Sequence, residues 1–360
     1  MAKLRVGIIG CGRPGRTAGA TGSGTAHVHA QGYVASPDCD LVAAADIKPE
    51  NLEAFCDEYD ISGRYLDHRE MLAQAELDVV SVCVWPHLHA RMVVDSANAK
   101  SVRAVHCEKP MALTWGDAKR MAAACEEKGV QLTFNHQRRF GKQFSKAKAL
   151  LDGGAIGGLV RLESFTSNLY DWGTHWFDMM FFYNGDVPAE WVIGQIDGRG
   201  GRQIFGATVE GQGLCMIRYQ NGVYGLMVTG QAFVGPEVET REERCANRLI
   251  GSEGTIEVDV QGGAMLRVRS LETGGAWQEI ELGERETWAD VVCAAIQGNV
   301  DALLAGREPE LSARKALQAT ELIFATWESS RARGRVDLPL EIEDSPLLSM
   351  IESGEIVISA

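Results

Sequence analysis

A lysine that could act on a reacting oxygen follows a short apolar stretch of this sequence. Lys109 stands in Glu108-Lys109-Pro110, directly after residues 102–107, which we interpret as a buried strand. In an open α/β sheet, ligands bind beyond the carboxyl ends of the strands. Pro110 favours extended geometry at the residue before it, so the lysine is directed rather than loosely tethered. Taken alone, a surface lysine beside a turn proline explains the motif equally well.

A glycine pattern predicts that a dinucleotide binds in the same part of the chain. An expected strand, residues 4–9, is followed by the GxGxxG sequence Gly10-Cys11-Gly12-Arg13-Pro14-Gly15. The first glycine of such a loop allows a tight turn, and the second lets the backbone approach a pyrophosphate at a helix N-terminus. We therefore expect Gly10, Gly12, Arg13 and Pro14 to bind the cofactor.

The acidic partner of this loop should be Asp46, at the end of an expected strand formed by residues 40–45. Such a carboxylate accepts hydrogen bonds from the adenosine ribose and usually lies about 20 residues beyond the loop, yet Asp46 is farther away. Residues 16–25 are too rich in glycine for an efficient helix, so we interpret them as a loop insertion over the cofactor. A glycine-broken helix is the alternative.

Asp46 also indicates which dinucleotide binds. A carboxylate at the ribose would repel the 2′-phosphate of NADP, so NAD is favoured, although NADP stays open because Lys48 could weaken that preference.

A second group of polar residues contains the residue types that a general base requires, a histidine with carboxylates nearby. Asp171, His175 and Asp178 are spaced so that all three share one face of a helix. Asp171 is a candidate N-cap that would stay ionised, and a carboxylate nearby raises the proton affinity of a histidine and orients its ring. A helix cap beside a buried polar histidine is the alternative. We expect no metal site, because no cysteine or second histidine stands at ligand spacing.

The elements that position these residues change character along the chain. Up to residue 134, short β-rich runs alternate with helical segments, which predicts an N-terminal Rossmann domain, a doubly wound parallel sheet, over residues 1–134. Beyond it strands follow strands, and Asn221-Gly222 marks a tight hairpin. Residues 135–360 should therefore form an α+β domain with a large, mostly antiparallel sheet that binds the substrate and other subunits.

Composition excludes several classes of partner. The chain has 360 residues, 45% of them hydrophobic, and a net charge of -14. This acidic balance disfavours nucleic acid and anionic membrane surfaces, and no stretch approaches the length of a membrane span. Nine scattered cysteines without a CxxC pair, together with a start that lacks a signal-peptide core, lead us to expect a cytoplasmic protein.

Together these motifs resemble the glucose-fructose oxidoreductase, inositol dehydrogenase and MocA family. The most specific marks are Glu108-Lys109-Pro110 and the Asp-x-Gly-x-His stretch from Asp171 to His175. The resemblance covers nearly the whole chain, and further matching segments are Trp85-Pro86-His87-Leu88-His89, Asn135 with Arg138-Arg139-Phe140, residues 251–256 and residues 310–339. Two departures are the glycine-rich insertion and Trp85 with His87, where many relatives have threonine and asparagine.

The resemblance implies an NAD-dependent oxidoreductase that transfers hydride between a secondary hydroxyl of a sugar, sugar derivative or cyclic polyol and the nicotinamide. Lys109, Asp171 and His175 would be catalytic, with the choice of base between Lys109 and His175 open. By position in the matching segments, the additional cofactor contacts are Trp85, Pro86, His89, Glu108 and Arg138. The substrate contacts, besides the catalytic residues, are Arg139, Asn168, Tyr170 and Trp172.

Other functions remain compatible with the sequence. One is an NAD-recycling glycoside hydrolase or lyase that acts through a transient keto-sugar, and another is a non-catalytic nucleotide-sensing protein on the same scaffold. Family members commonly form dimers or tetramers through the sheet of the second domain. We therefore expect a homodimer or homotetramer.

Overall fold

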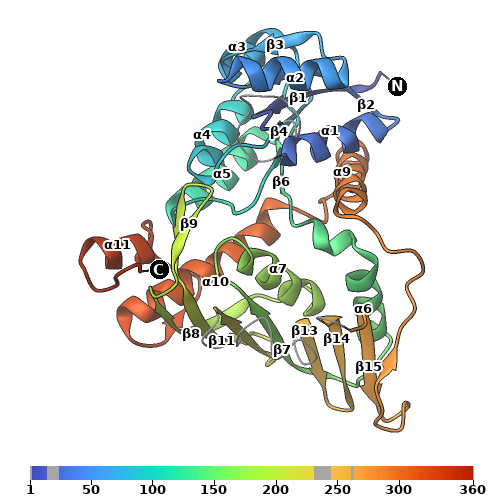
Figure 1. Ribbon diagram of the computed structural model, residues 1–360, viewed down its shortest axis with the longest axis vertical. Helices are drawn as coiled ribbons and strands as arrows, with labels where there is room; N and C mark the ends of the chain where they lie inside the picture. Colours follow the sequence, from blue (N-terminus) through green and yellow to red (C-terminus); the bar gives the residue numbers. More distant parts are fainter. Residues whose placement is uncertain (1, 14–23, 231–244, 261–262, 360) are drawn as a thin grey trace. The chain divides into compact units, whose positions relative to one another are not determined.

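The computed structural model describes residues 2–13, 24–230, 245–260 and 263–359 (Figure 1). The chain forms two compact units. The first comprises Met1–Ala112, Asp117–Phe140 and Glu286–Ala316, and the second comprises Leu113–Gly116, Gly141–Arg285 and Leu317–Ala360.

The first unit is built on a six-stranded sheet in the order β3-β2-β1-β4-β5-β6, and every pair of neighbours is parallel. The chain starts in the middle of the sheet, builds one side and then returns to build the other, so β1 and β4 flank the point where the direction of winding reverses. The strands are β1 (Leu4–Ile9), β2 (Cys39–Ala45), β3 (Gly63–Tyr65), β4 (Val79–Val82), β5 (Ala104–Cys107) and β6 (Gln131–Phe134).

Helices cross between these strands, as parallel pairing requires. They are α1 (Thr25–Ala35), α2 (Pro49–Tyr59), α3 (His68–Gln74), α4 (Pro86–Ala97) and α5 (Trp115–Lys128), followed by the short 3₁₀ helix η1 (Gln137–Phe140). The strands are buried on both faces and are therefore almost continuously apolar, as in Val79–Val82, where only Ser81 is polar.

A helix from far along the chain completes this unit. α9 (Trp288–Ala305) packs beside α1, and Val292, Ile296 and Val300 belong to the same buried cluster as Val28 and Tyr33. The contact is close, because a Cβ added at Gly32 would lie 2.7 Å from Ile296 Cδ1. A boundary at residue 134 therefore does not describe the whole first unit, since Glu286–Ala316 returns to it.

The second unit contains a nine-stranded sheet in the order β16-β15-β14-β13-β7-β12-β11-β8-β17. Its neighbours are antiparallel except for the parallel pair β7 and β12. The strands are β7 (Leu159–Thr166), β8 (Ala189–Asp197), β11 (Gln212–Tyr219), β12 (Tyr224–Thr229), β13 (Cys245–Gly251), β14 (Gly254–Val260), β15 (Leu266–Ser270), β16 (Gln278–Glu279) and β17 (Val336–Asp337). Between β8 and β11 the chain makes a separate hairpin from β9 (Arg202–Ile204) and β10 (Ala207–Val209).

Helices cover one face of this sheet. The helices of the unit are α6 (Lys142–Asp152), α7 (Gly173–Tyr183), α10 (Ala313–Ala332, mostly in this unit) and α11 (Pro346–Glu352), and Figure 1 shows α6, α7 and α10 along the sheet. The covered face carries Cys215, Ile217 and Met227, all fully buried. The opposite face carries Ile193 and Met216, which are 44% and 40% exposed.

The register shows how this opposite face is organised. Cross-strand partners share a face of a sheet. One row across the strands, which we call the open-face row, therefore runs through Ile193, Met216, Leu226, Glu163, Arg248, Glu257 and Arg267. Its first three members are apolar, and the rest alternate in charge.

The expected fold class is confirmed. A parallel Rossmann-like sheet is followed by a mostly antiparallel one, and helices such as α2, α4 and α5 alternate with the strands of the first sheet as expected. The short elements β3, α3 and the β9–β10 hairpin were not predicted, because three to seven residues are too few to show a clear periodicity. Among the helices of the described residues, none is long and apolar enough to cross a bilayer.

Candidate active site

The glycine loop has the backbone geometry that a dinucleotide needs. Gly10 and Gly12 follow β1 with φ of 87° and 66°. A Cβ at Gly10 would lie 2.7 Å from Val84 Cγ1 and 2.8 Å from the Cys83 carbonyl oxygen, so a larger residue would be both strained and crowded. The residues present therefore fit a bound pyrophosphate.

Asp46 lies against this loop at the end of β2. Its Oδ2 accepts hydrogen bonds from the backbone N–H groups of Cys11 and Gly12, at 2.9 and 3.3 Å, and its Oδ1 accepts one from Lys48 N–H at 2.8 Å. The sequence-based pairing of Asp46 with the glycine loop thus has a direct structural counterpart. Pro14 and Gly15 lie outside the described residues, as do residues 16–23 of the proposed insertion, whereas Thr25 begins α1.

Lys109 stands at the carboxyl end of β5. Glu108 N–H donates to the Val82 carbonyl at 2.9 Å, which continues the pairing with β4, and the Lys109–Pro110 peptide bond is cis. Lys109 is half-buried. The lysine therefore lies at the edge of the sheet that binds ligands in folds of this type.

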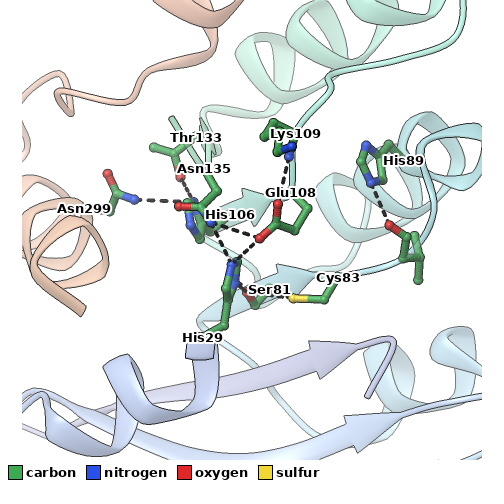
Figure 2. A network of polar contacts seen from close by, with 11 residues as sticks. His29, Ser81, Cys83, His89, His106, Glu108, Lys109, Thr133, Asn135 and Asn299 are labelled. Atoms are coloured by element: carbon green, nitrogen blue, oxygen red, sulfur yellow. Dashed lines mark hydrogen bonds and ion pairs between the residues drawn. The ribbon is translucent and has the colours of Figure 1, made fainter. Parts of the chain in front are cut away.

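A buried polar network lies directly beneath this lysine (Figure 2). Glu108 Oε1 is 2.9 Å from His29 Nε2 and accepts a hydrogen bond from Asn135 Nδ2, also at 2.9 Å. Glu108 Oε2 accepts the backbone N–H of Lys109 at 3.2 Å. The other ring nitrogen of His29, Nδ1, lies 2.7 Å from Ser81 Oγ. The Glu108 carboxylate, which follows β5, thus contacts α1 and the segment after β6, and β4 joins the network through His29.

The charges of this network follow from its partners. Burial alone would raise the pKa of Glu108, but the hydrogen bonds from His29 and Asn135 and the charges of His29 and Lys109 outweigh it and lower the pKa. Burial alone would lower the pKa of His29, whereas its neighbours Cys83 and Glu108 raise it. His106 stacks on His29 at 4.9 Å, and burial together with the charge of His29 lowers the pKa of His106 to about 3. The directions of these shifts favour an ionised pair of His29 and Glu108 beside a neutral His106.

His89, expected to contact the cofactor, is fully buried between two loops. Its Nδ1 lies 2.9 Å from the Pro110 carbonyl oxygen, and its Nε2 lies 3.0 Å from that of Val84. Burial lowers the pKa of His89. The ring thereby connects the loop after β4 to the loop that follows Lys109.

The other expected residues of this unit differ in exposure. Trp85 is exposed at the N-cap position of α4, and Pro86 is the first residue of that helix. Arg138 and Arg139 lie in η1, where Arg139 is buried and its Nη1 is 2.8 Å from Glu310 Oε1. Their contacts with cofactor or substrate stay predictions.

The second unit holds the turn that carries Asp171. Asn168 Oδ1 accepts the Asp171 backbone N–H at 2.7 Å, and the Asn168 carbonyl accepts Gly173 N–H at 2.9 Å. The expectation that Asp171 caps the helix is wrong. Trp172 occupies the N-cap position of α7, without a side-chain cap, because the amide of Asn168 holds the preceding turn in a conformation that delays the helix. Asp171 therefore precedes the helix that bears His175 and Asp178.

The aromatic residues around this turn have different surroundings. Trp172 is exposed, and its ring lies 6.5 Å from that of His175 on α7. Tyr170 is buried and stacks on Trp327 at 5.9 Å, and burial raises its pKa. Trp176 packs against Phe144. Of the residues expected to act on the substrate, Asp171 and Trp172 thus lie in this turn, and Trp172 lies near His175.

Two buried residues that contact the segments carrying Lys109 and Asp171 were not found by sequence reasoning. His29 is 79 residues from Glu108. Glu210, fully buried after β10, accepts hydrogen bonds from Leu169 N–H at 2.5 Å and from Trp327 Nε1 at 3.1 Å, so it anchors the turn before Asp171. Neither belongs to a local spacing pattern, and only the tertiary structure shows their partners. The described residues contain no group of three or more His, Cys, Asp or Glu side chains arranged to hold a metal ion.

Two family models match the chain. The oxidoreductase family model for an NAD-binding Rossmann fold matches residues 4–136, and the model for the C-terminal α/β domain of the same family matches residues 163–338. The protein is an NAD-binding oxidoreductase, a dehydrogenase that acts on CH–OH groups. More specifically, the chain belongs to the Gfo/Idh/MocA family, as the resemblance of its motifs predicted.

Individual relatives share only a minor part of their sequence with this chain. The chain is 27% identical to D-apiose dehydrogenase of Paraburkholderia graminis over 98% of this chain and 95% of that protein. It is 30% identical to inositol 2-dehydrogenase of Rhizobium meliloti over 52% of this chain and 56% of that protein. Among solved structures, levoglucosan dehydrogenase in complex with NADH and L-sorbose superposes with a TM-score of 0.79 at 19% identity, covering 94% of this chain and 100% of that one.

Proposed function

We propose that the protein oxidises a secondary hydroxyl of a sugar, sugar derivative or cyclic polyol, and that Lys109, Asp171 and His175 carry out the reaction. The observation that carries this proposal is the presence, in one chain of this family, of a lysine at the end of β5, of Asp171 in the turn before α7 and of His175 in the first turn of α7. The names of the relatives, dehydrogenases of D-apiose, inositol and levoglucosan, support the substrate class.

The glycine loop and Asp46 would hold the cofactor. NAD, when bound, supplies the acceptor for the hydride that leaves the substrate carbon. The backbone of Gly10 and Gly12 lets a pyrophosphate approach, and the Asp46 carboxylate accepts hydrogen bonds from the ribose hydroxyls. Because a carboxylate would face the 2′-phosphate of NADP, we propose that NAD is preferred.

The chain's own residues accept the proton of the substrate hydroxyl and stabilise the negative charge on its oxygen. The imidazole of His175 takes the proton of the substrate hydroxyl, and the carboxylate of Asp171 orients that ring and stabilises its protonated form. The ammonium group of Lys109 donates a hydrogen bond to the same oxygen and stabilises the negative charge that develops on it. In the reducing direction these transfers are reversed.

The test is turnover with a defined panel and a matched pair of variants. D-apiose, myo-inositol and levoglucosan are incubated with NAD, and NADH is followed by its absorbance. Lys109→Ala should lower kcat by about 100-fold or more, as loss of one oxyanion donor does in other enzymes, while NADH binding stays near wild type. Lys100→Ala removes an exposed lysine of the same unit and should leave kcat unchanged. Full activity of Lys109→Ala, or no NADH with any alcohol of a broad sugar panel, would contradict the proposal.

Product analysis separates the alternatives. A dehydrogenase accumulates NADH in proportion to the keto product, whereas a redox-recycling hydrolase or lyase releases product without net NADH. No observation on the described residues favours that reaction or a nucleotide-sensing role. The cytoplasm stays our expected location, and fractionation of the source cells would test it.

We also propose that the open-face row lies in an interface between copies of this chain. Large hydrophobic side chains are exposed together on this face of the sheet, namely Ile193, Met216, Leu214 and Tyr224. Soluble proteins usually bury such a group against a partner. Glu163 and Glu257 in the same row are already paired with Arg248, at 3.1 and 2.7 Å. Such paired charges would fix the register of two sheets packed face to face. A homodimer or homotetramer in light scattering would support this, and a monomer at all concentrations would refute it.

A further inference from the structure

The buried network beneath Lys109 contains a charged residue that the proposed reaction does not use. His29 lies on α1, and its side chain has no solvent exposure. Both ring nitrogens are engaged, Nε2 with Glu108 Oε1 at 2.9 Å and Nδ1 with Ser81 Oγ at 2.7 Å (Figure 2). Burying an imidazole costs free energy unless its nitrogens are hydrogen-bonded, and here both have partners.

Glu108 connects this histidine to the lysine. One oxygen of its carboxylate faces His29 and Asn135, while the other accepts the backbone N–H of Lys109 at 3.2 Å. The orientation of the carboxylate therefore decides where the Lys109 peptide is held. Because Glu108 is itself buried, its negative charge needs a buried positive partner. His29 is that partner, and the neighbouring His106 stays neutral.

We propose that His29 is a positioning residue for Lys109: its buried positive charge holds the Glu108 carboxylate, which in turn fixes the peptide of Lys109. The inference rests on the proposed function, in which Lys109 binds the reacting oxygen. His29 also neutralises the carboxylate, so Glu108 does not draw the ammonium group of Lys109 toward the interior of the sheet. A neutral hydrogen-bond donor at position 29 would supply one contact but not the charge.

The primary variant is His29→Gln, which keeps a hydrogen-bond donor and removes the charge. We expect kcat with the best alcohol of the panel to fall about 100-fold, the size of effect that a misplacement of about 1 Å produces. The dissociation constant for NADH should stay near wild type, because His29 does not belong to the glycine loop.

The matched control is His68→Gln. His68 is another buried histidine of the same unit, and its Nε2 lies 2.8 Å from Asp95 Oδ2, but it makes none of the contacts of the network beneath Lys109. This variant should lose stability from the broken pair and keep wild-type kcat. If both variants lost kcat to the same extent, His29 would be an ordinary structural residue and the proposal would be wrong.

A second readout does not depend on turnover. Lysines are dimethylated with ¹³C-formaldehyde, and the Lys109 resonance is assigned by its absence in Lys109→Arg. We expect this resonance to move in His29→Gln and to stay in place in His68→Gln. If no alcohol of the panel is oxidised, the proposed function fails while this measurement still decides whether His29 positions Lys109.

Removal of both charges keeps the test open if His29→Gln does not fold. The double variant His29→Gln/Glu108→Gln leaves no lone buried charge, and should fold better than the single variant while its Lys109 resonance remains displaced. A Lys109 resonance at the wild-type position in the double variant, together with wild-type kcat, would overturn the proposal.

Discussion

Replacing Glu210 by glutamine tests how much the free energy of unfolding is lowered by burying a carboxyl group next to the turn that carries Asp171. Both oxygens of Glu210 accept hydrogen bonds, from Leu169 N–H and Trp327 Nε1, and the group is fully buried. Burial raises the pKa of Glu210 from 4.5 to about 7, although the hydrogen bonds oppose that rise. The folded chain therefore binds a proton at Glu210 more tightly than the unfolded chain does.

The sign and size of the effect follow from proton linkage. Below pH 4.5 the carboxyl group is protonated in both states, and stability is at its full value. As the pH rises from 4.5 to about 7, only the unfolded state ionises, so the free energy of unfolding falls. The difference between the two pKa values corresponds to a loss of about 3 kcal/mol. Above pH 7 both states are ionised, and the loss is complete.

Denaturant unfolding of the wild type and of Glu210→Gln between pH 4.5 and 8 measures this loss. Because glutamine does not titrate, the wild type should lose about 3 kcal/mol relative to the variant across that interval. Trp327→Phe removes a donor that favours the charged form, so its loss should extend to higher pH. If the free energy of unfolding of the wild type stayed constant relative to that of Glu210→Gln across this interval, or rose relative to it, the reasoning would be refuted.

Two other variants test the cofactor and interface proposals. Asp46→Ser should lower kcat/KM for NAD by about 30-fold, the equivalent of about 2 kcal/mol for a lost charge-assisted hydrogen bond, and should lower the ratio of activity with NAD to that with NADP; an unchanged ratio would contradict the role of Asp46. Met216→Asp should convert the oligomer to smaller species in light scattering, because it places a charge in the apolar half of the open-face row. Val357→Asp changes an exposed residue outside this row and should leave the oligomer intact.

The sequence was informative where chemistry depends on neighbouring residues. The glycine loop and Glu108-Lys109-Pro110 are local patterns that directly follow clearly apolar segments. In the structure both lie at the ends of strands. The pairing of Asp46 with the loop could also be predicted, because parallel strands bring their carboxyl ends to one edge.

The rest depends on contacts between distant segments. His29 meets Glu108 only because α1 packs across the sheet, and Glu210 meets Leu169 only because the β9–β10 hairpin returns the chain to the turn before α7. The cap of α7 was mispredicted for a local reason, since the Asn168 carbonyl accepts the backbone N–H of Gly173, which an Asp171 cap would need. Single-sequence patterns do not contain this competition, because either residue is a good helix cap.

The return of α9 to α1 has a consequence for the order in which the protein is made. Val292, Ile296 and Val300 close the cluster that contains Val28 and Tyr33, but they are synthesised after nearly all of the second unit's sheet. A growing chain that already contains β1 to β6 still lacks one side of its first core, and that apolar surface stays uncovered until residue 300 has left the ribosome. The nucleotide-binding unit is therefore first in sequence, but its core is closed only after most of the second unit has been synthesised.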